Sequence, residues 1–474
     1  MSISPHILPE IFLPVAGCVL LLVAAIERCN LRLISWLTAG VFLCAAVLVF
    51  SVPEGRFSLF DLSIVDELAR YGKMLVLSAG ALSLVLAPSY MRDVGRYRPE
   101  YPVLLLFAIL GMLIMISASH FLTLYLGLEI QNLALYVLVA FCREDKKGSE
   151  AALKYYILGA VSSAVLLFGL SLLYGATGSL DFAALAAGKG TGLALGLVFV
   201  LVGFAFKLAA VPFHMWAPDV YEGAPTPVTA FLLAAPKVAG LIVVARLFLH
   251  PMMTEPSIWQ PLLIVFSLLS MFLGALGGLA QQNINRLLAY SAITNVGVML
   301  VGLVLLGQSN VAAAGFSGTL LYLALYLMGT IGFFAGVLML RKEGAALCEL
   351  KDLSGLLKTH PLLASSLCAS LFSLAGIPPL AGFFGKYKVF LAAVEGGEMT
   401  LAVLGVLASV IAAAYYLRVI KIMAFDPPPE KDIIMITDRP LYAVCVLSGI
   451  AVVGFMISPA PLMDAAQRAA ESLF

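Results

Sequence analysis

The chain has 474 residues, of which 62% are hydrophobic and only 12% are charged. Because so few polar side chains cannot cover the surface of a soluble protein of this size, the composition excludes a soluble globular fold and predicts a membrane protein. The net charge of +1, spread over scattered lysines and arginines, argues against nucleic acid as a partner and leaves the lipid bilayer as the surroundings.

Apolar runs long enough to cross a bilayer recur along the whole chain and predict an all-α polytopic membrane protein with about 14 transmembrane helices. In chain order, the expected spans are 7–27, 33–50, 70–90, 101–119, 121–141, 152–174, 192–222, 228–249, 259–280, 287–306, 311–340, 361–395, 399–424 and 441–458.

Basic residues of the loops predict the orientation of these spans. Lysines and arginines such as Arg96, Lys147, Arg286 and Lys358 fall on alternate loops, and far fewer occur on the other side. Loops rich in such residues stay in the cytoplasm. We therefore expect a multi-pass protein of a bacterial inner (plasma) membrane, with both termini facing outward.

Two of the long spans, 192–222 and 361–395, are interrupted by proline near their middle. Proline removes a backbone donor, and in lipid the freed carbonyls need another helix, a side chain or water, so broken helices mark cavities. The sequence of the first break, residues 208–212, recurs almost unchanged at 374–378. Because equivalent helices are an odd number of spans apart, the second copy is predicted to be inverted in the membrane, as in many transporters.

Four ionisable residues lie inside the spans, where a charge costs about 2.5 to 3.5 kcal/mol on insertion scales. They are Glu129, Lys207, Lys237 and Lys386. Burial and a neighbouring opposite charge shift proton affinity in opposite directions, so such groups can exchange protons. We predict that they form a proton relay in which Glu129 and Lys207 lie within about 4 to 6 Å of each other.

The alternative to a relay is a structural role for these charges. A lysine or arginine near a helix end can extend its stem to the headgroups, which fits Arg246, Lys388 and Arg418 better than the four residues above. Glutamate is too short to do so, and the alternative for Glu129 is a structural hydrogen bond to a neighbouring helix.

Three further residues are weaker candidates for the relay. Lys154 opens its span at the cytoplasmic side, and His214, two residues after Pro212, titrates in the range needed to bridge two lysines. His214 is equally suited to bonding a carbonyl of the broken helix. Tyr290 is suited either to a hydroxyl relay or to packing in the core.

Residues 207–229, KLAAVPFHMWAPDVYEGAPTPVT, resemble the signature of the antiporter-like membrane subunits of respiratory complex I, and within that family most resemble subunit N. The segments 286–291 and 376–386 strengthen the resemblance, which runs over nearly the whole chain. The related M-type subunit has glutamate where Lys386 stands.

This resemblance implies two inverted five-helix repeats and proton transport within an NADH:quinone oxidoreductase. The expected division places N-terminal helices 1–3 in residues 1–100, helices 4–8 in 101–250, helices 9–13 in 251–425 and helix 14 in 426–474. The resemblance also implies that Glu129 and Lys207 are an ion pair, that Lys237 is the central relay, and that Lys386 faces the exit or the next subunit.

The sequence has no NAD-binding loop, flavin motif or Fe–S cysteine set, so we expect no cofactor, metal or redox centre in the chain itself. NAD, FMN, Fe–S clusters and quinone are expected in partner subunits, and the resemblance implies antiporter-like and small membrane subunits as neighbours. Three alternatives remain open. They are a subunit of a multisubunit Mrp-type cation/proton antiporter, a structural membrane subunit whose buried charges only hold helices together, and a quinone-binding enzyme with a quinone-sized cavity.

Overall fold

A computed structural model describes residues 8–25, 30–52, 55–56, 62–142, 144–249, 256–308, 310–342, 345–429 and 433–474. The helices before the first break are α1 (Leu8–Ala24), α2 (Leu31–Ser51), α3 (Glu67–Asp93), α4 (Glu100–Ser117), α5 (Phe121–Val139), α6 (Lys146–Thr177) and α7 (Thr191–Leu208). They are followed by α8 (Trp216–Gly223), α9 (Thr226–Leu249), α10 (Pro256–Leu279), α11 (Ile284–Val304), α12 (Ala312–Val337), α13 (Leu356–Thr359) and α14 (Pro361–Ala375). The last helices are α15 (Ala381–Glu395), α16 (Met399–Phe425), α17 (Arg439–Gly454) and α18 (Ala460–Glu471).

The described helices account for the 14 predicted spans. Eleven are long and apolar enough to cross a membrane, and α1, α14 and α17 are shorter apolar helices. The helices α8 and α15 complete the two broken spans that α7 and α14 begin. The predicted all-α polytopic fold is therefore confirmed. The sequence interpretation did not predict the short helix α13 or the C-terminal helix α18, which packs against α3 and α12.

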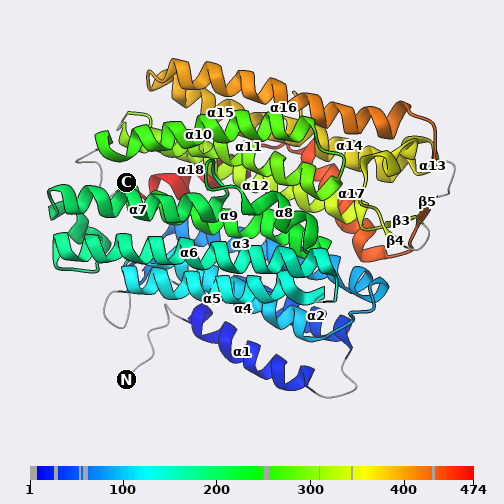
Figure 1. Ribbon diagram of the computed structural model, residues 1–474, viewed down its shortest axis with the longest axis horizontal. Coiled ribbons are helices and arrows are strands. Elements are labelled where there is room, and N and C mark those ends of the chain that lie inside the picture. Colours follow the sequence, from blue (N-terminus) through cyan, green and yellow to red (C-terminus); the bar gives the residue numbers. More distant parts are fainter. Residues whose placement is uncertain are drawn as a thin grey trace.

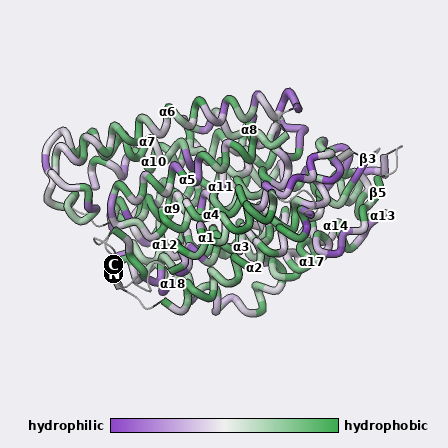
Figure 2. Tube along the Cα trace, turned by 90° about the horizontal axis from the view of Figure 1, so that it is seen from below, coloured by the Kyte–Doolittle hydropathy of each residue, from purple (hydrophilic) through white to green (hydrophobic). Residues whose placement is uncertain are grey.

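Short strands lie at the ends of the bundle. Strand β1 (Gly55–Arg56) pairs antiparallel with β2 (Ile64–Val65), and β3 (Leu340–Lys342) pairs antiparallel with both β4 (Ala345–Ala346) and β5 (Ile433–Met435). The helices run along a common direction, with the start of α1 and the C-terminus at one end and β3, β4, β5 and α13 at the other (Figure 1). Hydrophobic residues line the helices, and hydrophilic segments occur at the end that carries β3 and α13 (Figure 2).

Local side chains decide where several helices begin. Asp66 accepts a hydrogen bond from the backbone N–H of Ala69 at 2.7 Å, and Asn283 accepts one from that of Arg286 at 3.0 Å. Each side chain satisfies a backbone donor of a first helical turn that has no partner within the helix. These caps explain why α3 and α11 begin where they do.

The two repeats pack their helices in the same way. Helix α4 packs against α5, as α10 packs against α11, while α6 contacts both halves of the first broken span and α12 contacts both halves of the second. Equivalent helices are five spans apart and so run in opposite directions. The repeats meet where α9 contacts α11 and α12, where α8 contacts α11 and where α7 contacts α10.

The backbone also fixes how the two breaks correspond. Ala209 ends α7 in the left-handed region at φ 58°, and Gly376 ends α14 there at φ 81°. The next residues, Ala210 and Ile377, donate hydrogen bonds to carbonyls five positions earlier, at 2.8 and 3.1 Å. The sequence match had aligned Ala209 with Ala375, so the structure corrects that alignment by one residue.

Candidate functional site

Glu129 and Lys207 are joined through an asparagine rather than by direct contact. Glu129 and Asn132 lie three residues apart on α5 and so share one face of the helix. The Lys207 ammonium, in the last turn of α7, donates to Asn132 Oδ1 at 3.1 Å, and Asn132 Nδ2 donates to Glu129 Oε1 at 3.4 Å. The sequence interpretation missed Asn132, although its position three residues after Glu129 was a usable signal.

This first group lies toward the outside of the bundle. Glu129 and Lys207 are both only partly buried. Leu126 and Leu133, which flank Glu129 on α5, are more than half exposed. The Glu129 carboxylate therefore lies next to an exposed apolar surface of α5, which lipid or another protein would cover.

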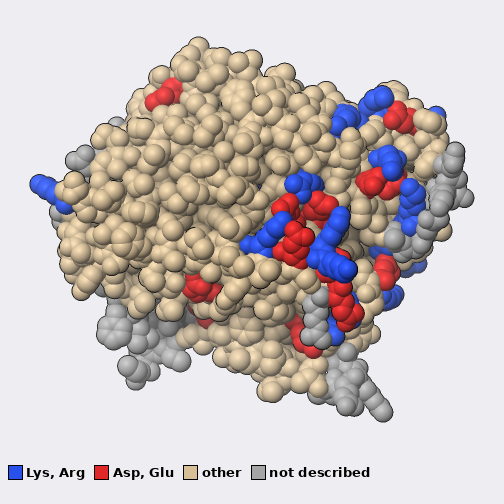
Figure 3. Space-filling view, viewed as in Figure 1, with Lys and Arg blue, Asp and Glu red and all other residues tan. Residues whose placement is uncertain are grey.

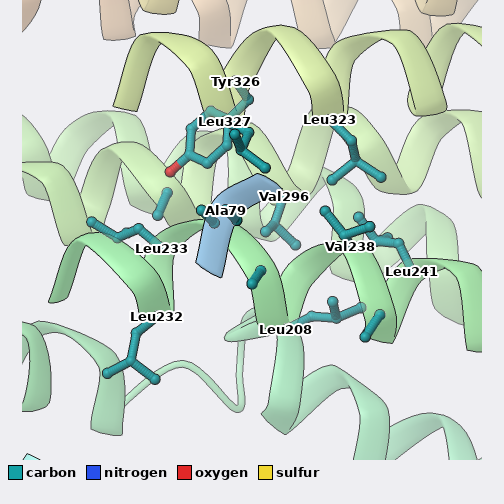
Figure 4. Close-up of a cluster of buried hydrophobic side chains, with 14 of the residues drawn as sticks. Ala79, Leu208, Leu232, Leu233, Val238, Leu241, Val296, Leu323, Tyr326 and Leu327 are labelled. Carbon is teal, nitrogen blue, oxygen red and sulfur yellow. The ribbon is translucent and has the colours of Figure 1, made fainter. Parts of the chain in front are cut away.

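Lys237 lies in the centre of the bundle, on α9, and is 2% exposed. Its ammonium lies 5.2 Å from the centre of the Tyr326 ring and makes no hydrogen bond to the residues that the structure describes. The close-up of this region shows Tyr326 and Leu327 of α12 beside Leu233 and Val238 of α9 (Figure 4). Among the residues that the structure describes, the Tyr326 ring is the group placed to stabilise the buried Lys237 ammonium, through a cation–π interaction.

Lys386 lies just after the second break, on α15, and caps the helix before it. Its ammonium donates to the carbonyls of Leu374 at 3.2 Å and Ala375 at 3.1 Å, the last two residues of α14. Carbonyls at a helix C-terminus have no intrahelical partner and carry partial negative charge, so a cation is favoured there. The same ammonium lies 5.9 Å from the Tyr322 ring.

A buried network of neutral polar groups extends from Tyr322. The Tyr322 hydroxyl donates to Asn295 Oδ1 at 2.7 Å, and Asn295 Nδ2 lies 3.3 Å from the Tyr416 hydroxyl and 3.4 Å from Ser291 Oγ. Ser291 and Tyr416 are also hydrogen-bonded to each other. Helices α11, α12 and α16 each contribute to this network, which the sequence interpretation did not predict.

The weaker candidates lie apart from these groups. His214, in the first break, is half-buried, and its Nδ1 makes no hydrogen bond to the described residues. Tyr290 packs its ring against Gly277 of α10, where an added Cβ would lie 2.5 Å from Tyr290 Cε1. His214 thus lies in the helix break, and Tyr290 packs against a neighbouring helix. Within the described segments of the chain, neither side chain is hydrogen-bonded to a buried lysine.

Lys154 belongs to an ion cluster formed by α6, α8 and α11. Its ammonium lies 2.7 Å from carboxylate oxygens of both Glu150 and Asp219. Arg286 continues the cluster, at 2.7 Å from Asp219 and 3.1 Å from Glu222. In the space-filling view, most of the acidic and basic side chains on this face gather on one side, and the rest of the face carries only a few isolated charges (Figure 3). The cluster links the first repeat to the second at one end of the bundle.

The prediction that Arg246 extends to the headgroups is wrong. Arg246 is 5% exposed, its guanidinium binds both carboxylate oxygens of Asp66 at 2.7 and 2.5 Å, and its Nε donates to the Ile116 carbonyl at 2.9 Å. Asp66 lies outside the apolar runs, so no sequence pattern pairs it with a residue 180 positions away. Lys388 and Arg418 also bond protein groups, namely the Gln467 amide and the Leu279 and Gln281 carbonyls.

The described residues contain no group of three or more His, Cys, Asp or Glu side chains that could hold a metal ion. The chemistry that these residues offer is that of carboxylate, ammonium, amide and hydroxyl groups. Such groups bind and release protons or pass them along hydrogen bonds.

The chain is similar to known membrane subunits. Residues 118–412 match the family described as NADH:quinone oxidoreductase/Mrp antiporter, transmembrane. NADH-quinone oxidoreductase subunit N of Rhodospirillum rubrum is 44% identical, over 98% of this chain and 96% of the relative. The subunit N of Granulibacter bethesdensis is 45% identical, over 98% of each chain.

Solved structures show the same fold. A chain of respiratory complex I from Thermus thermophilus with bound aureothin has a TM-score of 0.83 and 30% identity, covering 96% of this chain and 98% of that chain. A chain of the Mrp complex from Dietzia has a TM-score of 0.83 at 22% identity, covering 100% of this chain and 98% of that chain. At that identity the second likeness shows the fold alone.

Proposed function

Because this chain belongs to the NADH-quinone oxidoreductase subunit N family, we propose that it is a proton-translocating membrane subunit of an NADH:quinone oxidoreductase (respiratory complex I). In this proposal the chain contributes to a translocase enzyme without carrying its redox centre. NAD, FMN, Fe–S clusters and quinone are held by partner subunits, whose redox chemistry drives the protons.

A line of buried charges across both repeats carries this proposal. Glu129, Asn132 and Lys207 form its first group, and Lys237 lies deeper, at the helix that joins the repeats. Lys386 lies at the second break, and Tyr322 and Tyr326 of α12 lie one turn apart, each beside one lysine. Buried charges in a membrane protein are costly and mark ion or proton pathways.

The roles follow from the positions along this line. Glu129 and Lys207 act as the paired switch. The Asn132 amide bonds both side chains, so a change in the protonation of one affects the other. Lys237 is the central relay, and Lys386 faces the exit or the next subunit. Lys154, in the ion cluster, and His214 and Tyr290, which lie off the line, contribute less.

The surroundings of Glu129 support a partner at α5. A carboxylate next to exposed leucines on a membrane-length helix is costly against lipid, so another membrane subunit of the complex, antiporter-like or small, covers this surface.

The end with the ion cluster faces the cytoplasm and both termini face outward, as the basic loops predict. Residues 101–250 and 251–425 are the two transport repeats, which follow the N-terminal helices in 1–100 and precede helix 14 in 426–474.

The test is proton pumping by the assembled complex in vesicles, measured beside quinone reduction. We expect Glu129→Gln and Asn132→Leu each to lower the number of protons moved per quinone several-fold, because one removes the charge and the other removes the bridge. Glu395→Gln, which removes an exposed carboxylate outside the line, is the matched control and should pump at the parental ratio. An unchanged ratio in Glu129→Gln with intact assembly would reduce Glu129 to a structural hydrogen-bonding group.

A further inference from the structure

A groove with a charged mouth and an apolar floor opens between α2, α3 and the start of α17. Its volume is about 320 Å³. Arg32 and Arg439 line the mouth together with Asp438, while Leu84 and Val85 of α3 line the floor. None of the residues that line the groove belongs to the proposed proton pathway.

The mouth of the groove carries more positive than negative charge among the residues that the structure describes. The Asp438 carboxylate already has hydrogen-bond partners within the protein. It accepts hydrogen bonds from the Ser89 hydroxyl and from the backbone N–H of Leu441 at the start of α17. Arg32 lies 3.7 Å from Asp438 and keeps about half of its side chain exposed. Arg439 is exposed and forms no ion pair with any residue that the structure describes. Two guanidinium groups therefore face one carboxylate.

A buried hydroxyl inside the groove also has no partner among the described residues. Ser35 is 5% exposed and lines the groove, and its Oγ makes no hydrogen bond to them. Thr38, one turn later on the same helix, instead donates to the Ile34 carbonyl at 2.8 Å. A buried hydroxyl without a hydrogen-bond partner destabilises the protein, so a polar atom of a ligand in the groove that bonded Ser35 Oγ would be favoured.

The groove has features that are typical of the boundary between lipid headgroups and acyl chains. The start of α2, the end of α3 and the start of α17 share one end of the bundle, and the apolar runs extend from there into the membrane. Trp36 lines the groove and is 60% exposed, and Leu33 and Leu37 beside it are also exposed. Tryptophan is typical of this boundary because its ring is apolar and its N–H is polar.

We propose that this groove binds an anionic phospholipid, with its phosphate between Arg32 and Arg439, a glycerol or ester oxygen at Ser35, and an acyl chain along Leu84 and Val85. Guanidinium groups suit phosphate oxygens, to which they donate paired hydrogen bonds. A free phosphate would leave the apolar floor uncovered. A neutral quinone would leave the arginines without an anion.

The experiment uses the intact complex in nanodiscs of phosphatidylcholine doped with phosphatidylglycerol, followed by counting of retained lipids by mass spectrometry. We expect the double variant Arg32→Gln, Arg439→Gln to retain phosphatidylglycerol about tenfold less well, since each basic group near the bilayer surface favours an anionic lipid. Ala39→Phe, which fills the groove without changing its charge, should also lose the lipid.

The matched control is Lys358→Gln with Lys421→Gln, which removes two positive charges at the same end of the bundle but outside the groove. It should retain phosphatidylglycerol like the parent. Equal retention in the parent and the arginine variant would overturn the proposal, as would retention of phosphatidylcholine in place of phosphatidylglycerol. Displacement by millimolar inorganic phosphate would identify a free-anion site, and displacement by a short-chain quinone a quinone site. Either result would overturn lipid binding.

Discussion

At the scale of single residues, the three lysines of the proposed relay contact groups that carry no charge. Lys207 bonds Asn132, Lys386 bonds two helix-end carbonyls, and Lys237 has an aromatic ring beside it. A cation over a ring gains about 2 kcal/mol or more when both are shielded from water. The ring of Tyr326 is therefore expected to stabilise the Lys237 ammonium, which makes no hydrogen bond to the described residues.

A cation–π contact needs the aromatic ring of Tyr326 and does not need its hydroxyl, so two substitutions can test the two groups separately. Tyr326→Phe keeps the ring face and should retain most proton pumping, while Tyr326→Leu removes the face and should lower pumping several-fold. Pumping per quinone reduced in vesicles, normalised to assembled complex, measures both. If Phe is as impaired as Leu, the hydroxyl is the important group, and if Leu pumps like the parent, the ring has no such role.

The site residues that were predicted from the sequence are charged, and most of those that were missed are neutral. Glu129, Lys207, Lys237 and Lys386 stand out because a charge inside an apolar run has few explanations. Asn132 and the buried tyrosines do not stand out, because neutral polar and aromatic residues also occur in helices that merely pack. The charge of Arg246 was visible, but its partner Asp66 lies outside the apolar runs, and only the fold brings the two together.

At the scale of the elements, the second break positions its lysine through a glycine. Gly376 adopts a left-handed conformation, and an added Cβ would lie 2.8 Å from Lys386 Cδ and 3.4 Å from its Nζ. The first break places Ala209 in the same conformation, so glycine is not needed for the turn alone. What the second break requires is space for the lysine stem against the end of α14.

We therefore expect Gly376→Ala to displace the Lys386 ammonium from the Leu374 and Ala375 carbonyls and to lower pumping several-fold. Gly397→Ala is the matched control, because Gly397 has a φ of 82° and no atom within 4 Å of an added Cβ. Both variants bear a similar backbone penalty of about 1 to 2 kcal/mol. Thermal unfolding of the two should therefore be similar, and only the pumping of Gly376→Ala should fall. Equal pumping in both would mean that Lys386 tolerates the displacement.

The spans were predictable because an apolar run of about 20 residues in a bilayer usually forms a transmembrane α-helix. The breaks were also predictable from proline, but their alignment was wrong by one residue, since a short sequence match does not reveal which residue takes the left-handed conformation. The short helix α13 and the helix α18 were missed because neither contains a run long enough to span. Their places are decided by contacts with the bundle.

At the scale of the whole molecule, ion pairs at both ends hold the bundle together. The ion cluster of Arg286, Asp219 and Glu222 joins the second repeat to the first. At the other end, Asp66 at the start of α3 pairs with Arg246 of α9, and Lys73 of α3 pairs with Glu10 of α1. The first pair connects the N-terminal helices to the first repeat, and the second joins two N-terminal helices to each other.

The pair at Asp66 predicts how the stability of the whole chain depends on pH. Burial alone would raise the pKa of the Asp66 carboxyl, but the Arg246 guanidinium and the Ala69 backbone N–H outweigh it and lower the pKa below its ordinary value. A carboxyl whose pKa is lower when folded stabilises the fold fully above its unfolded pKa, near 3.9, and loses that contribution as pH falls through its folded pKa. The unfolding temperature in detergent should therefore stay level from pH 7 to about 5 and fall below about 4.

Asp66→Asn tests the origin of this acid sensitivity. The variant leaves the buried Arg246 without its charge partner, so it should unfold at a lower temperature at pH 7, by an amount on the order of 3 to 5 kcal/mol in stability. It should also lose part of the decline below pH 4, because no carboxyl remains at this position to be protonated. Asp464→Asn, which changes an exposed carboxylate on α18, should keep both the parental stability and the parental decline. If Asp66→Asn declines as steeply with acid as the parent does, other carboxylates control the acid response and the pair only holds α3 to α9.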